Sequence, residues 1–256
     1  MKQINWLLAT DIDNTLTGGD PQDLKRLAIQ IGRLRAQGRL VLFLSTGRTL
    51  NQVLTGFEQE YIPAADAIIS QVGTEVYVPP FSAGMAPLSI WDSFLQQQFS
   101  RERATEFLNG IEGAQLQPAR YNTPLKVSYF LDQAPDPPAA AERVRQRVAE
   151  AGDGYRVVWS SGKHLDILPA NAGKANAIRF LINYFNLLPQ KVITAGDSGN
   201  DRSMIDTFDY GIIVGNAQPM LKQLQQDPHR ATLYFAEQAY AAGVEEGLRH
   251  LGVLEE

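Results

Sequence analysis

The sequence of 256 residues predicts an α/β protein, with a Rossmann-like parallel-sheet core and a smaller α+β unit inserted into it. An uninterrupted apolar run of strand length, residues 40–44, is typical of a strand covered on both faces, and residues 191–195 predict another strand. Helical periodicity between such strands favours right-handed parallel units. Between residues 83 and 168 the pattern changes to alternating strands and proline-rich turns. We therefore expect a discontinuous core, 1–82 and 169–256, around an insert at 83–168.

The first half of the core alternates strand, helix and strand. An apolar run at residues 7–9 predicts a first strand that ends near Asp11. Asp20 and Pro21 are typical of a helix start, and Gly38 ends the leucine periodicity that follows. The remaining elements predicted here are a strand at 40–44, a helix beginning at 45–48, and short strands at 67–70 and 75–78.

The insert shows helices and alternating strands. We expect one helix from about Asp92 to Asn109, a strand at 126–131 and a helix at 137–151. Strands at 155–160 and 164–168 form a predicted hairpin that turns at Ser161-Gly162. This mixture predicts a small α+β domain.

The parallel α/β pattern returns after Pro169. A helix opens at Gly173-Lys174, and the strand at 191–195 runs into the acidic loop 196–201. The last predicted elements are a strand at 211–214, a short strand near 233–235, and a helix carrying Val244, Leu248 and Leu251. The second half therefore completes the sheet begun by the first.

The composition excludes several functional classes. A formal net charge of -5 and a pI near 5.3 argue against nucleic acid or an anionic membrane as the main partner. The absence of cysteine excludes disulfides, thiolate metal sites and a thiol nucleophile. No apolar run approaches the ~20 residues of a membrane helix, and no signal peptide is recognisable. We expect a cytoplasmic protein.

The pair Asp11 and Asp13 is the first chemical signal. The first strand ends here, and open α/β sheets place their ligands at the carboxyl ends of strands. Two adjacent carboxylates repel each other, and a divalent cation removes that penalty. Because hard oxygen ligands suit magnesium, we expect a Mg²⁺ site in which one carboxylate is free to act as a nucleophile.

Three further clusters lie at strand ends or helix starts: Thr46, Lys174 and the pair Asp197 and Asp201. Each alone is compatible with a solvated turn or a surface lysine. Together with Asp11 they supply the parts that phosphoryl transfer needs: a nucleophile, a metal, a hydroxyl anchor and a cation for the phosphoryl oxygens.

These four motifs, residues 11–15, 45–48, Lys174 and 196–201, resemble the ordered motifs of the haloacid dehalogenase superfamily. The insert resembles the α+β cap of the branch that hydrolyses sugar phosphates. Stretches over nearly the whole chain are similar to sucrose-phosphate phosphatases: 72–75, 126–129, 160–163, 166–169 and 215–219. The resemblance implies a Mg²⁺-dependent phosphatase that converts sucrose 6-phosphate to sucrose and phosphate.

The resemblance also implies roles for individual residues. Asp11 attacks phosphorus and becomes an aspartyl phosphate, and Asp13 protonates the leaving sugar oxygen and then activates water. Magnesium is held by Asp11, Asp197 and the backbone carbonyl of Asp13, while Asp201 holds a metal-bound water or orients Lys174.

Phosphate and sugar contacts follow from the same resemblance. Thr46 and Gly47 hold the transferring oxygens, Lys174 neutralises their charge, and Asn200 is an extra donor. The sugar pocket combines core and cap residues: Arg48, Gly73, Thr74 and Glu75 with Lys126 and Lys163. Two positions depart from the family pattern. Phe130 stands where relatives often have histidine, and Ala175 stands where they commonly have glycine.

Other functional classes account for these motifs less well. Gly196-Asp197-Ser198-Gly199 looks like a serine-hydrolase signature, but no histidine lies in a partner motif. Gly173-Lys174 lacks the glycine spacing and hydroxyl of a phosphate-binding loop. A catalytically silent sugar-phosphate binding protein, such as an accessory of a sucrose-phosphate synthase, is disfavoured because every catalytic position is filled. Mannosylfructose phosphate and glucosylglycerol phosphate stay open as substrates, as does association with such a synthase.

Overall fold

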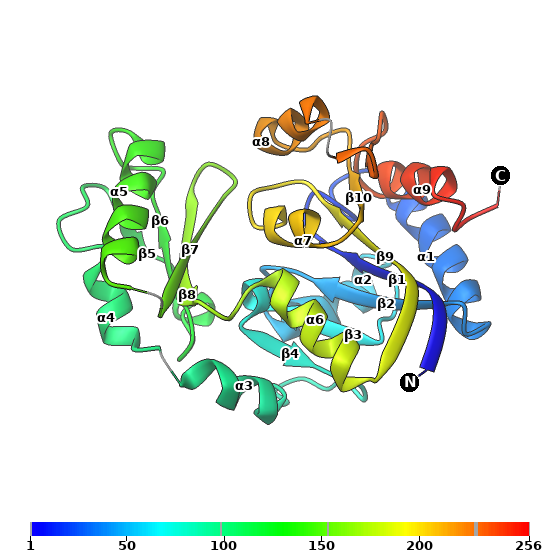
Figure 1. The fold of residues 1–256 in the computed structure, drawn as a ribbon, viewed down its shortest axis with the longest axis horizontal. Helices are drawn as coiled ribbons and strands as arrows, with labels where there is room; N and C mark the ends of the chain where they lie inside the picture. The colour runs from blue at the N-terminus through cyan, green and yellow to red at the C-terminus, as the bar shows by residue number, and fades with distance from the viewer. Residues whose placement is uncertain (1, 98, 153, 228–229, 256) are drawn as a thin grey trace.

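A seven-stranded sheet forms the centre of the core (Figure 1). The computed structural model describes residues 2–97, 99–152, 154–227 and 230–255. In pairing order the strands are β11 (Leu233–Phe235), β10 (Tyr210–Ile213), β9 (Leu187–Gly196), β1 (Lys2–Thr10), β2 (Leu40–Ser45), β3 (Ala67–Ser70) and β4 (Glu75–Tyr77). Neighbouring strands are parallel, except that β4 runs antiparallel to β3. The predicted α/β class is confirmed.

Helices cover both faces of this sheet, as the apolar strand runs require. Alternate residues of β1 and β2 enter different cores, because side chains alternate across a strand. Leu8 and Leu42 pack with α1 (Pro21–Ala36), α2 (Leu50–Gln59) and α9 (Tyr240–His250). Leu7 and Phe43 pack with α3 (Ser89–Gln96) and α6 (Lys174–Tyr184) on the other face. No helix among the described residues is long and apolar enough to cross a membrane.

The second sheet lies at one end of the molecule, away from the termini (Figure 1). Its antiparallel strands pair in the order β5 (Gln115–Leu116), β6 (Val127–Phe130), β8 (His164–Pro169) and β7 (Tyr155–Ser160). Helices α4 (Arg101–Glu106) and α5 (Pro137–Glu150) share a separate hydrophobic core with it. The predicted hairpin and the helix at 137–151 are confirmed, whereas the domain boundaries stay a prediction.

The helix predicted from Asp92 to Asn109 is wrong. Two helices, α3 and α4, replace it, and residue 98 lies outside the described residues. The side chain of Ser100 accepts a hydrogen bond from the backbone N–H of Arg103 and so caps a new helix. Trp91 and Leu95 of α3 pack into the core, whereas Ala104 of α4 packs under the second sheet, so the two segments serve different cores.

Other differences are smaller. Helix α2 begins at Leu50 and not at residues 45–48, because Thr49 and Gln52 form a reciprocal capping box. The sequence patterns did not predict β5, α7 (Arg202–Thr207) or α8 (Pro219–Lys222). All three are short, so they carry little periodicity.

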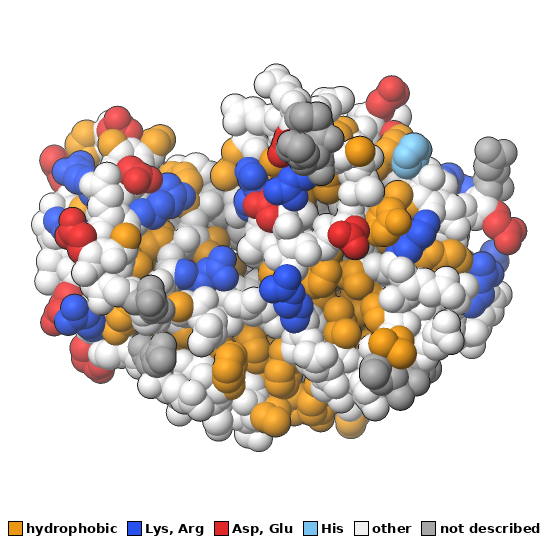
Figure 2. Space-filling model, in the orientation of Figure 1, with side chains coloured by type: hydrophobic (Ala, Val, Ile, Leu, Met, Phe, Trp, Pro, Cys, Tyr) orange, Lys and Arg blue, Asp and Glu red, His pale blue; other side chains and the backbone are white. Residues whose placement is uncertain are grey.

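The surface mixes charges of both signs (Figure 2). Acidic and basic side chains are interspersed on this face. Hydrophobic side chains gather over α3 and α6, where Ile90, Phe94 and Tyr184 are exposed.

The 3₁₀ turn η1 (Gln71–Gly73) brings the β3–β4 connection against the start of α6. Its residues have positive φ angles of 51°, 60° and 90°. A Cβ atom on Gly73 would lie 2.3 Å from the carbonyl carbon of Gly173, the residue before Lys174. Glycine is therefore required here by both conformation and space.

We expect Gly73→Ala to lower the free energy of unfolding by about 3 kcal/mol. The left-handed conformation costs about 1–2 kcal/mol for a residue with a Cβ, and the clash with Gly173 adds about 1–3 kcal/mol. Gly38→Ala is the matched control, because Gly38 has φ +68° with no atom within 4 Å of the added Cβ. Urea unfolding of both variants measures the difference. Equal losses would contradict the packing role of Gly73.

Candidate active site

Three strand ends meet where the sheet order places β1 between β2 and β9. Thr10 pairs with Leu44 on one side and with Ala195 on the other. The residues that follow each strand, Asp11, Thr46 and Asp197, therefore lie together at the carboxyl edge of the sheet. The predicted neighbourhood of Asp11 and Thr46 is confirmed.

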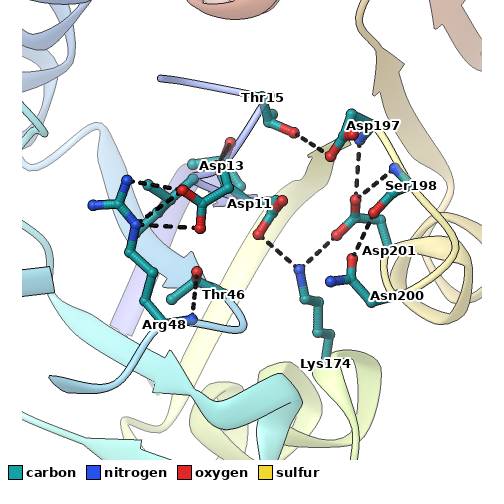
Figure 3. Close-up of polar contacts among 12 residues, drawn as sticks. Asp11, Asp13, Thr15, Thr46, Arg48, Lys174, Asp197, Ser198, Asn200 and Asp201 are labelled. Carbon is teal, nitrogen blue, oxygen red and sulfur yellow. Dashed lines mark hydrogen bonds and ion pairs between the residues drawn. The ribbon is translucent and has the colours of Figure 1, made fainter. Parts of the chain in front are cut away.

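The Lys174 side chain is fully buried and lies between two carboxylates (Figure 3). Its Nζ donates to Asp11 Oδ1 over 2.8 Å and to Asp201 Oδ1 over 2.6 Å. Burial lowers the pKa of Lys174, but the two carboxylates raise it more, so the balance lies above the usual value. The two carboxylates thus favour the ammonium form of Lys174, which has no solvent contact.

Asp11, Asp197 and Asp201 form a compact acidic cluster, in which one carboxylate oxygen of each lies within 4.8 Å of the others. Burial raises the pKa of Asp11 well above its usual value, and burial together with Asp201 raises the pKa of Asp197 to about 7. Three carboxylates against the one ammonium of Lys174 leave two negative charges when all are ionised. A divalent cation is the group that this donor set fits.

Asp201 has the firmest position in the cluster. Its second oxygen, Oδ2, accepts hydrogen bonds from the backbone N–H groups of Asp197 and Ser198, each over 3.0 Å. Because Oδ1 contacts Lys174, both oxygens of this carboxylate are engaged within the protein. Thr15 donates to Asp197 over 3.4 Å.

Asp13 stands apart from the acidic cluster, with a side chain that is 52% exposed. The Arg48 guanidinium donates to Asp13 Oδ1 through Nη2 over 2.8 Å, and to both Asp13 oxygens through Nε. The other side of Arg48 makes a two-bond pair with Glu60, over 2.8 and 2.9 Å. Sequence reasoning missed Glu60, because it lies in no motif and meets Arg48 only through the fold of α2.

A cavity of about 820 Å³ opens between the two sheets. The core side includes Asp11, Asp13, Gly47, Arg48 and Asn200, and the side formed by the second sheet includes Lys126 and Lys163. The structure therefore brings most of the predicted site residues around one space.

Phosphate-binding candidates lie close to Asp11. Thr46 is buried, and its Oγ1 accepts a hydrogen bond from the Arg48 backbone N–H over 3.1 Å. Asn200 Oδ1 accepts from the Ser198 hydroxyl over 3.2 Å, and its amide N–H₂ has no hydrogen-bond partner among the described residues.

Three predicted sugar-binding residues lie elsewhere. Among the described residues, Gly73, Thr74 and Glu75 do not line the cavity, whereas their neighbour Val72 does. Thr74 is buried and bonds the Gln71 carbonyl, and Glu75 accepts from the Tyr77 hydroxyl over 2.9 Å. Burial raises the pKa of Glu75. In this structure the three residues pack the base of the β3–β4 turn.

Lys126 is almost fully buried, although it lines the cavity. Its Nζ lies 3.9 Å from Asp166 Oδ1, and burial lowers its pKa. Sequence reasoning also missed several cavity residues that follow β5 or belong to η2 (Ala119–Tyr121) and β8: Gln117, Arg120, Tyr121, His164 and Asp166. The matches at 160–163 and 166–169 were the sequence signals near His164 and Asp166.

Among the described residues, side-chain hydrogen bonds from Gln71 and Gln52 connect the core with the side of the cavity formed by the second sheet. Gln71 donates to the Arg120 carbonyl over 2.8 Å, and Gln52 donates to the Tyr121 hydroxyl over 3.2 Å. Both donors are uncharged, so these contacts are readily replaced by water.

This fold and this site define a haloacid dehalogenase-like phosphatase. The chain belongs to the sucrose-6F-phosphate phosphohydrolase family, whose sequence model matches residues 4–252. The resemblance inferred from the motifs is confirmed.

Individual relatives are similar over most of the chain. The mannosylfructose-phosphate phosphatase of Agrobacterium fabrum is 33% identical over 248 residues, which are 96% of this chain and 97% of that protein. Sucrose-phosphatase 1 of Nicotiana tabacum is 28% identical over 257 residues, 96% of this chain but 59% of its own length. The structure of the sucrose-phosphatase from Synechocystis sp. PCC6803, in complex with sucrose and phosphate, matches with a TM-score of 0.88 and 30% identity over 100% of both chains.

We expect Lys174→Met to lower the free energy of unfolding by about 3–5 kcal/mol, because it leaves buried carboxylates without their cation. Lys163→Met is the control, since Lys163 is exposed and a surface change is expected to stay within about 0.5 kcal/mol. Denaturant unfolding in the presence of a chelator measures both. A Lys174→Met midpoint equal to that of the control would contradict the coupling seen in the structure.

Proposed function

We propose that this protein is a Mg²⁺-dependent phosphatase that hydrolyses sucrose 6-phosphate to sucrose and phosphate, through an aspartyl phosphate on Asp11. The observation that carries the proposal is the Asp11 carboxylate, held by buried Lys174 at the floor of a cavity with room for a disaccharide. Membership of the sucrose-6F-phosphate phosphohydrolase family supports it.

Asp11 is the nucleophile. Lys174 holds Oδ1, and no other described side chain bonds Oδ2, so Oδ2 is the oxygen that attacks phosphorus. The new bond joins Asp11 to phosphorus as the bond between phosphorus and the sugar oxygen breaks. Thr46, Gly47 and Asn200 donate to the transferring oxygens, and Lys174 offsets their charge.

Asp13 moves the protons. In its protonated form it gives a proton to the departing sugar oxygen, and it then takes one from the water that cleaves the aspartyl phosphate. Asp11 is thereby regenerated and phosphate is released. The exposed side chain of Asp13 allows this exchange, and its bond to Arg48 fixes its direction in the free protein. An incoming phosphate offers Arg48 a competing anionic partner.

The acidic cluster fits magnesium. Asp11, Asp197 and the backbone carbonyl of Asp13 are the proposed ligands, and the bound cation would neutralise the carboxylates and polarise the phosphoryl oxygens. Asp201 is the residue that orients Lys174, because both of its oxygens are already engaged by Lys174 and backbone N–H groups.

Mannosylfructose phosphate is the second candidate substrate. The relative named for that activity is 33% identical to this chain over 97% of its own length. Phosphate release with Mg²⁺ should be compared across sucrose 6-phosphate, mannosylfructose phosphate, glucosylglycerol phosphate and fructose 6-phosphate, with EDTA as the negative control. We expect the highest kcat/KM with sucrose 6-phosphate. A preference for fructose 6-phosphate would overturn the disaccharide assignment, and full activity in EDTA would overturn the metal.

We expect Asp11→Asn to lower kcat by at least about 10⁴-fold while the protein stays folded, because asparagine keeps the Lys174 contact but cannot attack phosphorus. Asp209→Asn is the control, since Asp209 is exposed and lies outside the cavity. Circular dichroism checks the fold, and peptide mass spectrometry excludes deamidation. An active Asp11→Asn protein in which the asparagine is intact would contradict the assignment of Asp11 as the nucleophile.

A further inference from the structure

His164 lines the cavity opposite the acidic cluster and is used by no step of the proposed reaction. It is the first residue of β8 and pairs in register with Phe130 of β6. Its ring lies 5.4 Å from that of Phe130, centroid to centroid. An aromatic surface therefore stands on the side of the cavity formed by the second sheet.

Gln117 determines which nitrogen of His164 carries the proton. The Gln117 side chain is buried, and its Nε2 donates to the Tyr129 carbonyl over 3.0 Å. Because a carbonyl can only accept, this atom is the amide nitrogen and not the amide oxygen. The same Nε2 lies 3.2 Å from His164 Nδ1. Nδ1 is therefore the acceptor, and the proton of the neutral ring is on Nε2.

The surroundings favour the neutral imidazole. Burial lowers the pKa of His164, and Lys163 and Lys126 act in the same direction, whereas Asp166 and Asp132 raise it; the balance lies below the usual value. A protonated Nδ1 would also meet the Gln117 N–H, donor against donor. No described residue bonds Nε2, so its N–H is a free donor on a residue that lines the cavity.

We propose that His164 is a specificity-determining residue that binds the non-phosphorylated ring of a disaccharide phosphate, with Nε2–H donating to a hydroxyl of that ring and Phe130 packing against its apolar face. The phosphorylated ring lies at Asp11, so the second ring extends toward β8 across the same cavity. Sites that read sugars combine apolar rings with a few placed donors. The inference rests on the proposed function for the substrate, but the tautomer does not depend on it.

The kinetic test replaces the donor and keeps the ring. We expect His164→Phe to raise KM for sucrose 6-phosphate by about 10–100-fold, the usual effect of losing one substrate hydrogen bond in a closed site, with kcat changed little. Turnover of p-nitrophenyl phosphate, which has no second sugar, should stay the same. His164→Gln, which keeps an N–H donor, should recover part of the loss. His250→Phe on α9 is the matched control, because His250 stacks on Tyr234 away from the cavity.

Parallel changes on both esters, or none on either, would overturn the inference. Absence of turnover on every ester by the unmodified protein would instead overturn the proposed function. The role of His164 is then tested by the binding of sucrose, measured by NMR. Imidazole ¹⁵N NMR of the wild-type protein, with the His164 signals assigned by their loss in His164→Phe, should show the Nε2–H tautomer. We expect sucrose, but not fructose, to shift its Nε2–H resonance. An Nδ1–H tautomer, or no shift with sucrose, would contradict the proposal.

Discussion

The site depends on one constraint, which is that a buried ammonium group must be surrounded by carboxylates. Lys174 has no solvent contact, so its charge is tolerable only where two strand ends and the start of α6 meet. The strand order β9–β1–β2 and the close approach of Gly73 to Gly173 bring these strand ends and the start of α6 together. Such a network contributes little net stability, and burial, followed by the neighbouring carboxylates of Asp201 and Asp197, raises the pKa of Asp11 despite the opposing charge of Lys174. A fold that keeps it does so for chemistry.

Much of the core could be predicted because its signals are local. Uninterrupted apolar runs predict strands that are covered on both faces, and the alternation of Leu7 and Leu8 between two hydrophobic cores confirms that reason. Once β1, β2 and β9 are parallel neighbours, the residues after them must share one edge of the sheet. Asp11, Thr46 and Asp197 could therefore be grouped before their distances were known.

The remainder of the site is formed by contacts between segments that carry no pattern of their own. Glu60 follows the end of α2 and contacts Arg48, and Gln117, which directly follows the two-residue strand β5, contacts His164. For Gly73 the sequence predicted a role that the structure does not show. Its sequence context predicts a ligand contact, yet its φ of 90° and the backbone of Gly173 give it a packing reason. The sequence alone does not show whether a glycine in a motif contacts a ligand or allows close backbone packing, because both roles require the same residue; the backbone conformation distinguishes them.

The two sheets line the cavity with different side chains. The core contributes Asp11, Asp197 and the Arg48 guanidinium, whereas the second sheet contributes Phe130, His164 and a nearly buried Lys126. Neutral side-chain bonds from Gln52 and Gln71 connect these parts, and Gln71 and Val72 have positive φ angles at that connection. Positive φ angles at residues other than glycine are unfavourable, so they persist only where the surrounding contacts fix the backbone. The residues proposed to act on phosphorus thus belong to a buried network, while those proposed to face the sugar lie on a second sheet with its own hydrophobic core. We therefore expect substitutions on the second sheet to change sugar preference without disturbing the acidic cluster.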